Sequence, residues 1–366
     1  MKRRTFLQQA GVGALMLYPS LTVLSACQDN KRPKVLILGG TYFLGPAIVN
    51  AIQSQGADIT LFNRGKTNPG LFPAHKHVSG DRLLGLRAYE GVREQDWDVV
   101  IDVWPEDSKL VDEATQSLQE RTKHYVFISS IAVYRNFQEV GLNEESEVVS
   151  FPASKEEWYY SEHKSYAEQL VRERFPGNHT ILRPGPIKGW RDPEMDLLYW
   201  LVKLRQQEEI LGPGTGDDPL QFIDVKDVGR FVAQAIHQKW MGTYNVTGPS
   251  AEPLLWREFL QKAKETLGVT TEVHWPSEDY LRAQSVRSFD DLPLWAPLSE
   301  DRGFMQISNE KLHAVGFEFS SLEQTIEDCL AWFAESHPEG LEFGISIRPG
   351  LDIEREQALI ELWKSS

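Results

Sequence analysis

Cysteine is scarce in this chain, because only two of its 366 residues are cysteines and two cannot form a disulfide framework. Basic residues are also too few to balance the acidic ones, with 38 against 53 and a net charge of −15. A surface of that sign repels phosphate backbones, which disfavours bulk binding of nucleic acid. The remaining composition, 41% hydrophobic and 25% charged, is that of an ordinary globular protein and excludes a disordered or multi-span membrane chain.

The first 26 residues contain no acid and have the order of an export signal, a basic start followed by a short apolar stretch. Arg3 and Arg4 open a segment that resembles the twin-arginine signal, which exports folded proteins. Residues 24–27 resemble a bacterial lipobox, so we expect lipidation at Cys27 and an exported lipoprotein anchored in the membrane, facing the periplasm or cell exterior. The alternative is an amphipathic anchor that stays attached. Removing residues 1–26 leaves 35 basic against 53 acidic residues, or −18.

Apolar strands alternate with helical segments after residue 33, which is typical of a parallel sheet covered on both faces. Strands are expected at 34–38, 58–62, 77–79, 98–103, 124–129, 179–182 and 243–246. Helices are expected at 43–55, 108–121, 155–175, 195–207, 226–237, 254–267, 321–335 and 352–363, with a loop at 290–302. The fold class is therefore α/β.

A glycine-framed turn, Gly39 to Gly45, joins the first expected strand to the first helix. In this context a pyrophosphate rests on backbone amides at the helix N-terminus, where the helix dipole favours anions. The alternative is a plain turn, and Tyr42 stands where the usual middle glycine is absent. The turn residues assigned to the cofactor are Gly39, Thr41, Phe43, Leu44 and Gly45.

The second strand ends close to Asn63, Arg64 and Lys66. An acid at this place would bind the ribose 2′-hydroxyl of NAD, whereas asparagine with two cations suits the 2′-phosphate of NADP. We therefore expect NADP, with NAD as the alternative cofactor. The remaining alternative is that these residues form a solvated basic turn and bind no ligand. Asp81, after the third strand, is expected to accept a hydrogen bond from the adenine amino group.

Ser130 follows the fifth expected strand, and Tyr160 and Lys164 lie four residues apart on the helix that comes next. Positions i and i+4 share a helix face, so the charge of Lys164 is expected to lower the pKa of the Tyr160 phenol. Tyr160 would then remove a hydroxyl proton as hydride leaves, while Ser130 hydrogen-bonds the reacting oxygen. Tyr199 and Lys203 have the same spacing but follow the next strand, so we interpret them as an ordinary helix face.

This set resembles the extended or atypical short-chain dehydrogenase/reductases, the NAD-dependent epimerase/dehydratase group, from residue 34 to about 249. The resemblance implies a Rossmann-type doubly wound sheet and the catalytic set Ser130, Tyr160 and Lys164, with Lys164 also holding the nicotinamide ribose. It places Pro184 and Gly185 beside the nicotinamide, and Val103 is also assigned to the cofactor. The C-terminal hundred residues match the family only loosely.

We divide the chain into an export signal at 1–26, a linker at 27–33, a Rossmann domain at 34–249 and a smaller C-terminal substrate lobe at 250–366, to which 186–218 contribute. Trp104, Trp190 and Trp200 are the residues expected to line the substrate pocket. No metal is expected, since the histidines at 75 and 77 have the pattern of surface residues.

The export signal shapes the functional hypotheses, because free NADP is not supplied outside the cytoplasm. The first is a redox-neutral epimerase, dehydratase or oxidoreductase, which acts on a small sugar-like substrate by hydride transfer and recycles a tightly held cofactor. The second is a reductase with exchangeable NADPH. The third is a non-catalytic dinucleotide-binding protein, or a nucleic-acid protein similar to some atypical plastid relatives with altered glycine motifs, which the net charge of −18 disfavours. The sequence leaves the substrate, the net reaction and the oligomeric state open.

Overall fold

The computed structural model describes residues 32–103, 106–152, 157–339 and 350–365. The expected export signal and Cys27 lie outside the described residues. Those from Pro33 onward belong to one compact unit. Within the described ranges no helix is long and apolar enough to span a bilayer.

A seven-stranded sheet, in which all neighbouring strands are parallel, forms the centre of the fold. Its order is β10-β6-β5-β4-β1-β2-β3. The strands are β1 (Lys34–Leu38), β2 (Asp58–Asn63), β3 (Lys76–Ser79), β4 (Val99–Asp102), β5 (Tyr125–Ile128), β6 (His179–Pro184) and β10 (Gly242–Val246). The strand order reverses between β1 and β4, and ligands of such sheets bind at the carboxyl ends of the strands at that point. The predicted Rossmann-type α/β fold is confirmed.

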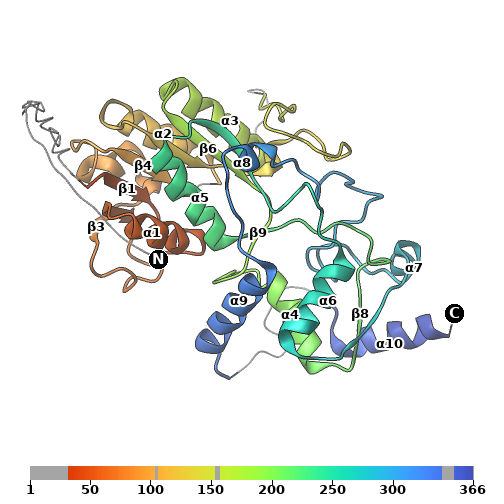
Figure 1. Ribbon diagram of the computed structural model, residues 1–366. Helices are drawn as coiled ribbons and strands as arrows, with labels where there is room; N and C mark the ends of the chain where they lie inside the picture. Colours follow the sequence, from red (N-terminus) through yellow and green to blue (C-terminus); the bar gives the residue numbers. More distant parts are fainter. Residues whose placement is uncertain (1–31, 104–105, 153–156, 340–349, 366) are drawn as a thin grey trace, which may run out of the picture. The chain divides into compact units, whose positions relative to one another are not determined.

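Two pairs of helices cover the two faces of this sheet: α1 (Leu44–Ser54) with α5 (Val225–Gln238), and α2 (Ser108–Leu118) with α3 (Tyr160–Arg174) (Figure 1). The sequence of β1 explains the two layers. Val35 and Ile37 lie in the core with α1 and α5, whereas Leu36 and Leu38 lie in the core with α2 and α3. Successive side chains of a strand point to opposite faces, so a strand that is apolar throughout is buried on both.

The C-terminal part has a hydrophobic core of its own, which includes Trp200, Trp256 and Trp295. Its elements are α4 (Asp196–Gln206), β8 (Glu209–Leu211), α6 (Trp256–Leu267), β11 (Glu272–His274), α7 (Glu278–Ala283), α9 (Leu322–Ser336) and α10 (Ile353–Lys364). A short helix, α8 (Glu310–Ala314), contributes Leu312 to the core of the main sheet instead. The strands β7 (Ile187–Lys188) and β9 (Ile223–Asp224) form a separate parallel pair.

Most expected elements lie within two residues of their observed bounds, but the helix expected at 155–175 begins only at Tyr160. Tyr159 has an extended backbone, and its N–H donates to Oε2 of Glu162 at 2.6 Å, which caps the helix. Tyr160 therefore stands in the first turn of the helix. The strands β7, β8, β9 and β11 were not predicted, because two or three residues carry no periodic pattern.

The second tyrosine–lysine pair, Tyr199 and Lys203, proves to be buried in the C-terminal core rather than on an open helix face. Lys203 Nζ donates to the Tyr199 hydroxyl at 2.9 Å and forms an ion pair with the buried carboxylate of Glu356 on α10. Burial lowers the pKa of Lys203, and Glu356 opposes that shift. The ion pair between Lys203 and Glu356 joins α4 to α10. Neither Tyr199 nor Lys203 lines the cavity described below.

We predict that Lys203→Met and Glu356→Gln each lower the free energy of unfolding by about 3–5 kcal/mol, because each leaves a buried group without its charged partner. The double variant leaves neither charge without a partner. Its loss of unfolding free energy should therefore be smaller than the sum of the two single losses by more than about 1 kcal/mol. Urea denaturation followed by tryptophan fluorescence measures all four proteins. Additive losses would show that the two charges do not stabilise each other.

Candidate active site

A cavity of about 1040 Å³ is lined by residues that follow the carboxyl ends of β1, β2, β4, β5 and β6. The expected catalytic and cofactor residues all line it: Ser130, Tyr160, Lys164, Gly39, Thr41, Phe43, Leu44, Gly45, Asn63, Arg64, Lys66, Asp81, Val103, Pro184 and Gly185. Segments far apart in the chain thus meet at one place, although the role of each residue stays a prediction.

The glycine turn has a backbone conformation in which residues with a side chain would be strained. Gly39 and Gly40 have φ angles of +115° and +95°, which side chains rarely tolerate. A Cβ on Gly45 would lie 2.5 Å from the carbonyl carbon of Gly40, so the first turn of α1 packs directly on the loop. Tyr42 keeps 61% of its surface exposed, so its ring does not fill the turn. The loop therefore has the open backbone cradle that a pyrophosphate requires.

The loop after β2 is fastened to the glycine turn by amide side chains. Asn63 donates from Nδ2 to the carbonyl of Gly39 at 2.9 Å and accepts from the N–H of Gly65 at 2.8 Å. Asn68 donates to the carbonyl of Thr41 at 2.7 Å. Asn63 therefore shapes the turn with both atoms of its amide, a role that the sequence did not indicate.

Arg64 and Lys66 lie on the same loop and line the cavity. Neither has an ion-pair partner within the part of the chain that the structure describes. Two cations without partners beside the cavity suit a phosphate group. Asp81, at the adjacent strand end, accepts from the N–H of Leu83 at 3.1 Å and caps the 3-10 helix Arg82–Gly91.

The reaction centre joins the end of β5 to the start of α3. Lys164 is buried, and its Nζ donates to the carbonyl of Ile128 at 2.9 Å and lies 5.6 Å from the centre of the Tyr160 ring. Ser130 accepts at Oγ from the N–H of Ala132 at 3.1 Å. Tyr160 is 45% exposed, which leaves its ring accessible from the cavity.

The pKa of Tyr160 shifts in the direction opposite to the one expected. Burial around the hydroxyl raises it, Glu106 raises it further, and only a hydrogen bond with Ser130 lowers it. Burial also lowers the pKa of Lys164 to about 8, against the pull of Asp102 and Glu168. The expected lowering of the phenol pKa is therefore not found in this structure, because burial of the Tyr160 hydroxyl outweighs the hydrogen bond with Ser130.

A buried ion pair between Arg82 and Asp102 lies at the cavity, where Arg82 is one of the lining residues, and sequence analysis did not predict it. Asp102, the last residue of β4, accepts from Arg82 at 2.6 and 3.0 Å and from the hydroxyl of Tyr125 at 2.8 Å. Arg82 also donates to the carbonyl of Leu110 at 2.7 Å. This network joins β4 and β5 to the loop after β3, below the expected nicotinamide end. An acid at the end of an apolar strand was the only available signal.

A second buried carboxylate, Glu168 on α3, connects this helix to the ends of β5 and β6 next to Tyr160 and Lys164 on the chain. It accepts from the Ser129 hydroxyl at 2.7 Å and from two nitrogens of Arg183 at 2.9 and 2.8 Å. Burial alone would raise the pKa of Glu168, but the hydrogen bonds and charge of Arg183 bring it below its ordinary value. Glu168 lies one turn after Lys164, so this contact fixes the rotation of α3.

Two of the three tryptophans expected to line the substrate pocket, Trp190 and Trp200, do not line the cavity. Trp200 is fully buried in the C-terminal core and donates from Nε1 to the carbonyl of Pro293 at 2.9 Å. Trp190 packs at the edge of the main core with Lys226 over its ring, away from the cavity lining. Both assignments are corrected, because large indoles fill cores first. Trp104 lies outside the described residues.

The far side of the cavity is lined by residues that sequence reasoning missed. They are the charged residues Lys188, Asp192, Glu194 and Asp196 and the apolar residues Phe137, Phe289, Leu294 and Phe304. The charged set follows the predicted nicotinamide loop within twelve residues of Pro184, which was the available signal.

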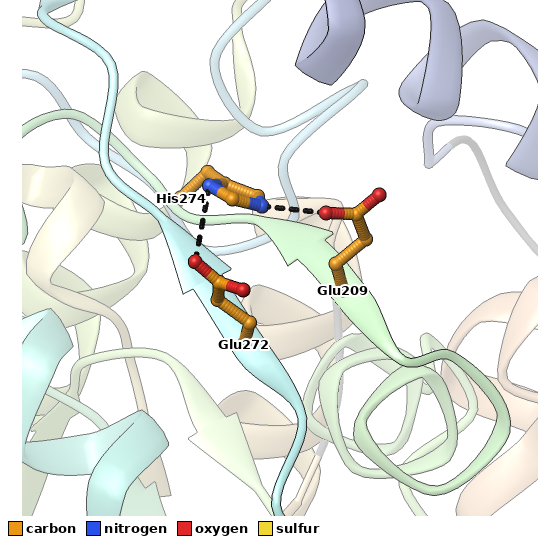
Figure 2. A group of neighbouring side chains, drawn as sticks. All are labelled: Glu209, Glu272 and His274. Atoms are coloured by element: carbon orange, nitrogen blue, oxygen red, sulfur yellow. Dashed lines mark hydrogen bonds and ion pairs between the residues drawn. The ribbon is translucent and has the colours of Figure 1, made fainter. Parts of the chain in front are cut away.

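One cluster of possible metal ligands lies outside this cavity, on the strand pair β8–β11. His274 stands between Glu209 at its Nε2, 2.8 Å away, and Glu272 at its Nδ1, 3.9 Å away (Figure 2). Lys364 donates to the same oxygen of Glu209 at 2.6 Å. A lysine and an imidazole on one carboxylate oxygen form an ion-pair cluster that joins α10 to the strand pair.

Comparison with curated proteins gives a relative in Arabidopsis thaliana, the chloroplast stem-loop binding protein of 41 kDa b. The two are 26% identical over 217 residues, 54% of each chain, so this chain spans about half of the length of that relative.

Solved structures with the same fold include two sugar-nucleotide epimerases. The UDP-Glc/GlcNAc 4-epimerase of Campylobacter jejuni has a TM-score of 0.60 and 14% identity, and the match covers 83% of this chain and 99% of that one. The UDP-glucuronic acid 4-epimerase of Bacillus cereus, in complex with UDP-glucuronic acid and NAD, has a TM-score of 0.58 and 13% identity, with coverages of 83% and 100%. Identities this low show the fold alone.

A protein-family model, that of the NAD-dependent epimerase/dehydratase family, matches the sequence of this chain. The match runs from residue 35 to residue 247, which is more than half of the sequence and includes the glycine turn, Ser130, Tyr160 and Lys164. The chain belongs to the NAD-dependent epimerase/dehydratase family.

Proposed function

We propose that this protein is a nicotinamide-dependent enzyme that oxidises and reduces a sugar or sugar-like substrate within one catalytic cycle and keeps its cofactor bound throughout. The observation that carries the proposal is that Ser130, Tyr160 and Lys164 line the same cavity as the glycine turn. Fold alone supports no particular chemistry, so the argument rests on this set of side chains.

The residues present fit a dinucleotide. The positive-φ glycines leave room for a pyrophosphate, and Arg64 and Lys66 offer charge for a 2′-phosphate, which favours NADP over NAD. Pro184 and Gly185 would flank the nicotinamide, which supplies a hydride acceptor and donor when it is bound. Lys164 would hold the nicotinamide ribose through its buried ammonium.

Tyr160 is the group placed to move the proton of the substrate hydroxyl. Its hydroxyl is partly desolvated and interacts with Ser130, so the same serine can orient the substrate oxygen and stabilise the tyrosinate. Lys164 is held by the carbonyl of Ile128 with a pKa of about 8, so its charge is available below that pH. Glu168 and Asp102 keep the helix and the strand ends in place and are positioning residues.

Retention of the cofactor is proposed because of the predicted export. A lipoprotein anchored at Cys27 outside the cytoplasm has no supply of NADPH, whereas a cofactor that is reduced and reoxidised in each turnover needs none. The alternative is a reductase with exchangeable NADPH, which requires the export prediction to be wrong. A nucleic-acid function like the one in the name of the Arabidopsis relative is disfavoured by the charge of −18 after residue 26.

We expect Tyr160→Phe to keep its cofactor and to lose about 10²–10⁴-fold in turnover, because it removes only the proton carrier. Tyr166→Phe is the matched control, since this tyrosine lies on the same helix outside the cavity and should keep full activity. Hydride transfer is measured with 4-deuterated cofactor by following deuterium into the product. Full activity in Tyr160→Phe would leave a dinucleotide-binding fold without this catalytic set.

The same experiment separates the two enzyme hypotheses. A redox-neutral enzyme should exchange deuterium between cofactor and substrate without accumulating free reduced cofactor. Release of one reduced or oxidised cofactor in each turnover would identify the exchangeable reductase.

Arg64→Ala should weaken NADP by about 10- to 150-fold and NAD by much less, because a charge-assisted contact to the 2′-phosphate is worth about 1.5–3 kcal/mol. Arg93→Ala, an exposed arginine outside the cavity, should leave both affinities unchanged. Isothermal titration of cofactor-stripped protein with each nucleotide gives the two ratios. An equal loss for NAD and NADP would contradict the preference for NADP.

A further inference from the structure

The loop after β7 places an unusual concentration of charge beside the reaction centre. Lys188 is 3% exposed, and its Nζ lies 2.8 Å from Glu194, 2.7 Å from Asp196 and 3.5 Å from Asp192. Burial opposes a charge at this place, yet the three carboxylates raise the pKa of Lys188 well above its ordinary value. The ammonium of Lys188 therefore stays charged and is neutralised by the acids of its own chain rather than by a ligand.

Asp192 is the member of this group with capacity left for a ligand. It is 2% exposed and lines the cavity, and its Oδ1 accepts from the N–H of Glu194 at 3.0 Å. Its Oδ2 has no hydrogen-bond partner among the described residues. This oxygen lies 3.5 Å from Nζ of Lys188, an ion pair that is not a hydrogen bond, so it keeps the capacity to accept a hydroxyl or N–H from a molecule in the cavity.

Three phenylalanine rings line the same part of the cavity. Phe137 and Phe304 meet edge to face at 5.0 Å between centroids, and Phe289 meets Phe304 in the same way at 5.6 Å. These rings offer an apolar wall to a ligand in the cavity that Asp192 also lines. Such a wall favours a compound with both hydroxyl groups and an apolar face.

The charges at this end are unsuited to a diphosphate. Binding of a diphosphate requires cations or free backbone amides, and Lys188, the last residue of β7, is already paired three times. Arg191, on the loop that follows, lies over the ring of Trp190 and does not line the cavity. Asp192, Glu194 and Asp196 present like charge to any phosphate that enters. The cations without partners, Arg64 and Lys66, lie instead at the glycine turn, where the cofactor is proposed to bind.

We propose that the substrate is an uncharged polyhydroxy compound, a sugar or glycoside without a phosphate group, whose hydroxyls donate to Asp192 and whose apolar face packs on Phe137 and Phe304. The proposal rests on the proposed function for the location of the reaction centre. It separates this chain from the UDP-sugar epimerases that share its fold by the chemistry of the substrate end.

Binding is tested on the full chain loaded with its dinucleotide, so that the glycine turn is filled. Calorimetric titrations use methyl glucosides, methyl galactosides, UDP-glucose and UDP as probes at 20 and 300 mM salt. At least one methyl glycoside should bind with little dependence on salt. UDP and UDP-glucose should bind more weakly, and higher salt should improve their binding, because ions screen repulsion.

Tighter binding of UDP-glucose than of every glycoside, weakening as salt rises, would overturn the proposal. These titrations need no turnover, so their result is independent of Tyr160 and of the proposed redox cycle. A protein that binds glycosides but transfers no hydride would refute the proposed function and leave the substrate class standing.

Asp192→Asn tests the recognising atom. It keeps the acceptor for the N–H of Glu194 and replaces the free oxygen by an amide nitrogen that donates, so glycoside affinity should fall by about 10- to 100-fold. Asp96→Asn, an exposed acid paired with Arg121 outside the cavity, is the matched control and should bind as the unchanged protein does. Unchanged glycoside affinity in Asp192→Asn would contradict the assignment. Phe304→Leu, which shortens the apolar wall and keeps the charges, should weaken glycosides in the same assay, and unchanged affinity there would count against the wall.

Discussion

The proposed reaction centre depends on the buried carboxylate of Glu168, which joins three elements at one point. It accepts from Ser129 at the end of β5 and from Arg183 at the end of β6, and it belongs to α3. Because Lys164 lies one turn earlier on that helix, the same contact directs its ammonium to the carbonyl of Ile128. Loss of this carboxylate would strand a buried arginine and release the helix that carries both Tyr160 and Lys164.

Burial sets the proton chemistry of the site more strongly than pair spacing does. Tyr160 and Lys164 share a helix face, yet desolvation raises the pKa of the first and lowers that of the second. Their pKa values nearly coincide in water and are thereby moved apart, so transfer of a proton from the Tyr160 hydroxyl to the Lys164 amine costs more than it would between two solvated side chains. The tyrosinate then depends on Ser130 and on the charge that a bound ligand brings.

The cavity has opposite character at its two ends. Arg64 and Lys66 offer uncommitted positive charge beside the glycine turn, whereas the loop after β7 carries three acids on one lysine. An anionic cofactor and an uncharged substrate would each find the end that suits it, and Tyr160 lies on the lining between the two sets. Charge separation of this kind orients both ligands without any movement of the sheet.

The sequence by itself determined the features that local patterns encode. Apolar strands such as β1, the glycine turn, and the spacing of Tyr160 and Lys164 each follow from periodicity or backbone geometry within a few residues. They predicted the parallel sheet and the part of the cavity lining assigned to the cofactor and to the catalytic set. The place of each pair in the order of strands also indicated which of two identical tyrosine–lysine spacings lines the cavity, but the burial of the pair at Tyr199 and its contact with Glu356 came only from the tertiary structure. The burial of Trp200 in the C-terminal core and the Asp192 oxygen without a hydrogen-bond partner were likewise visible only in the tertiary structure. These depend on burial and on partners distant in the chain, and neither is a property of a local sequence pattern.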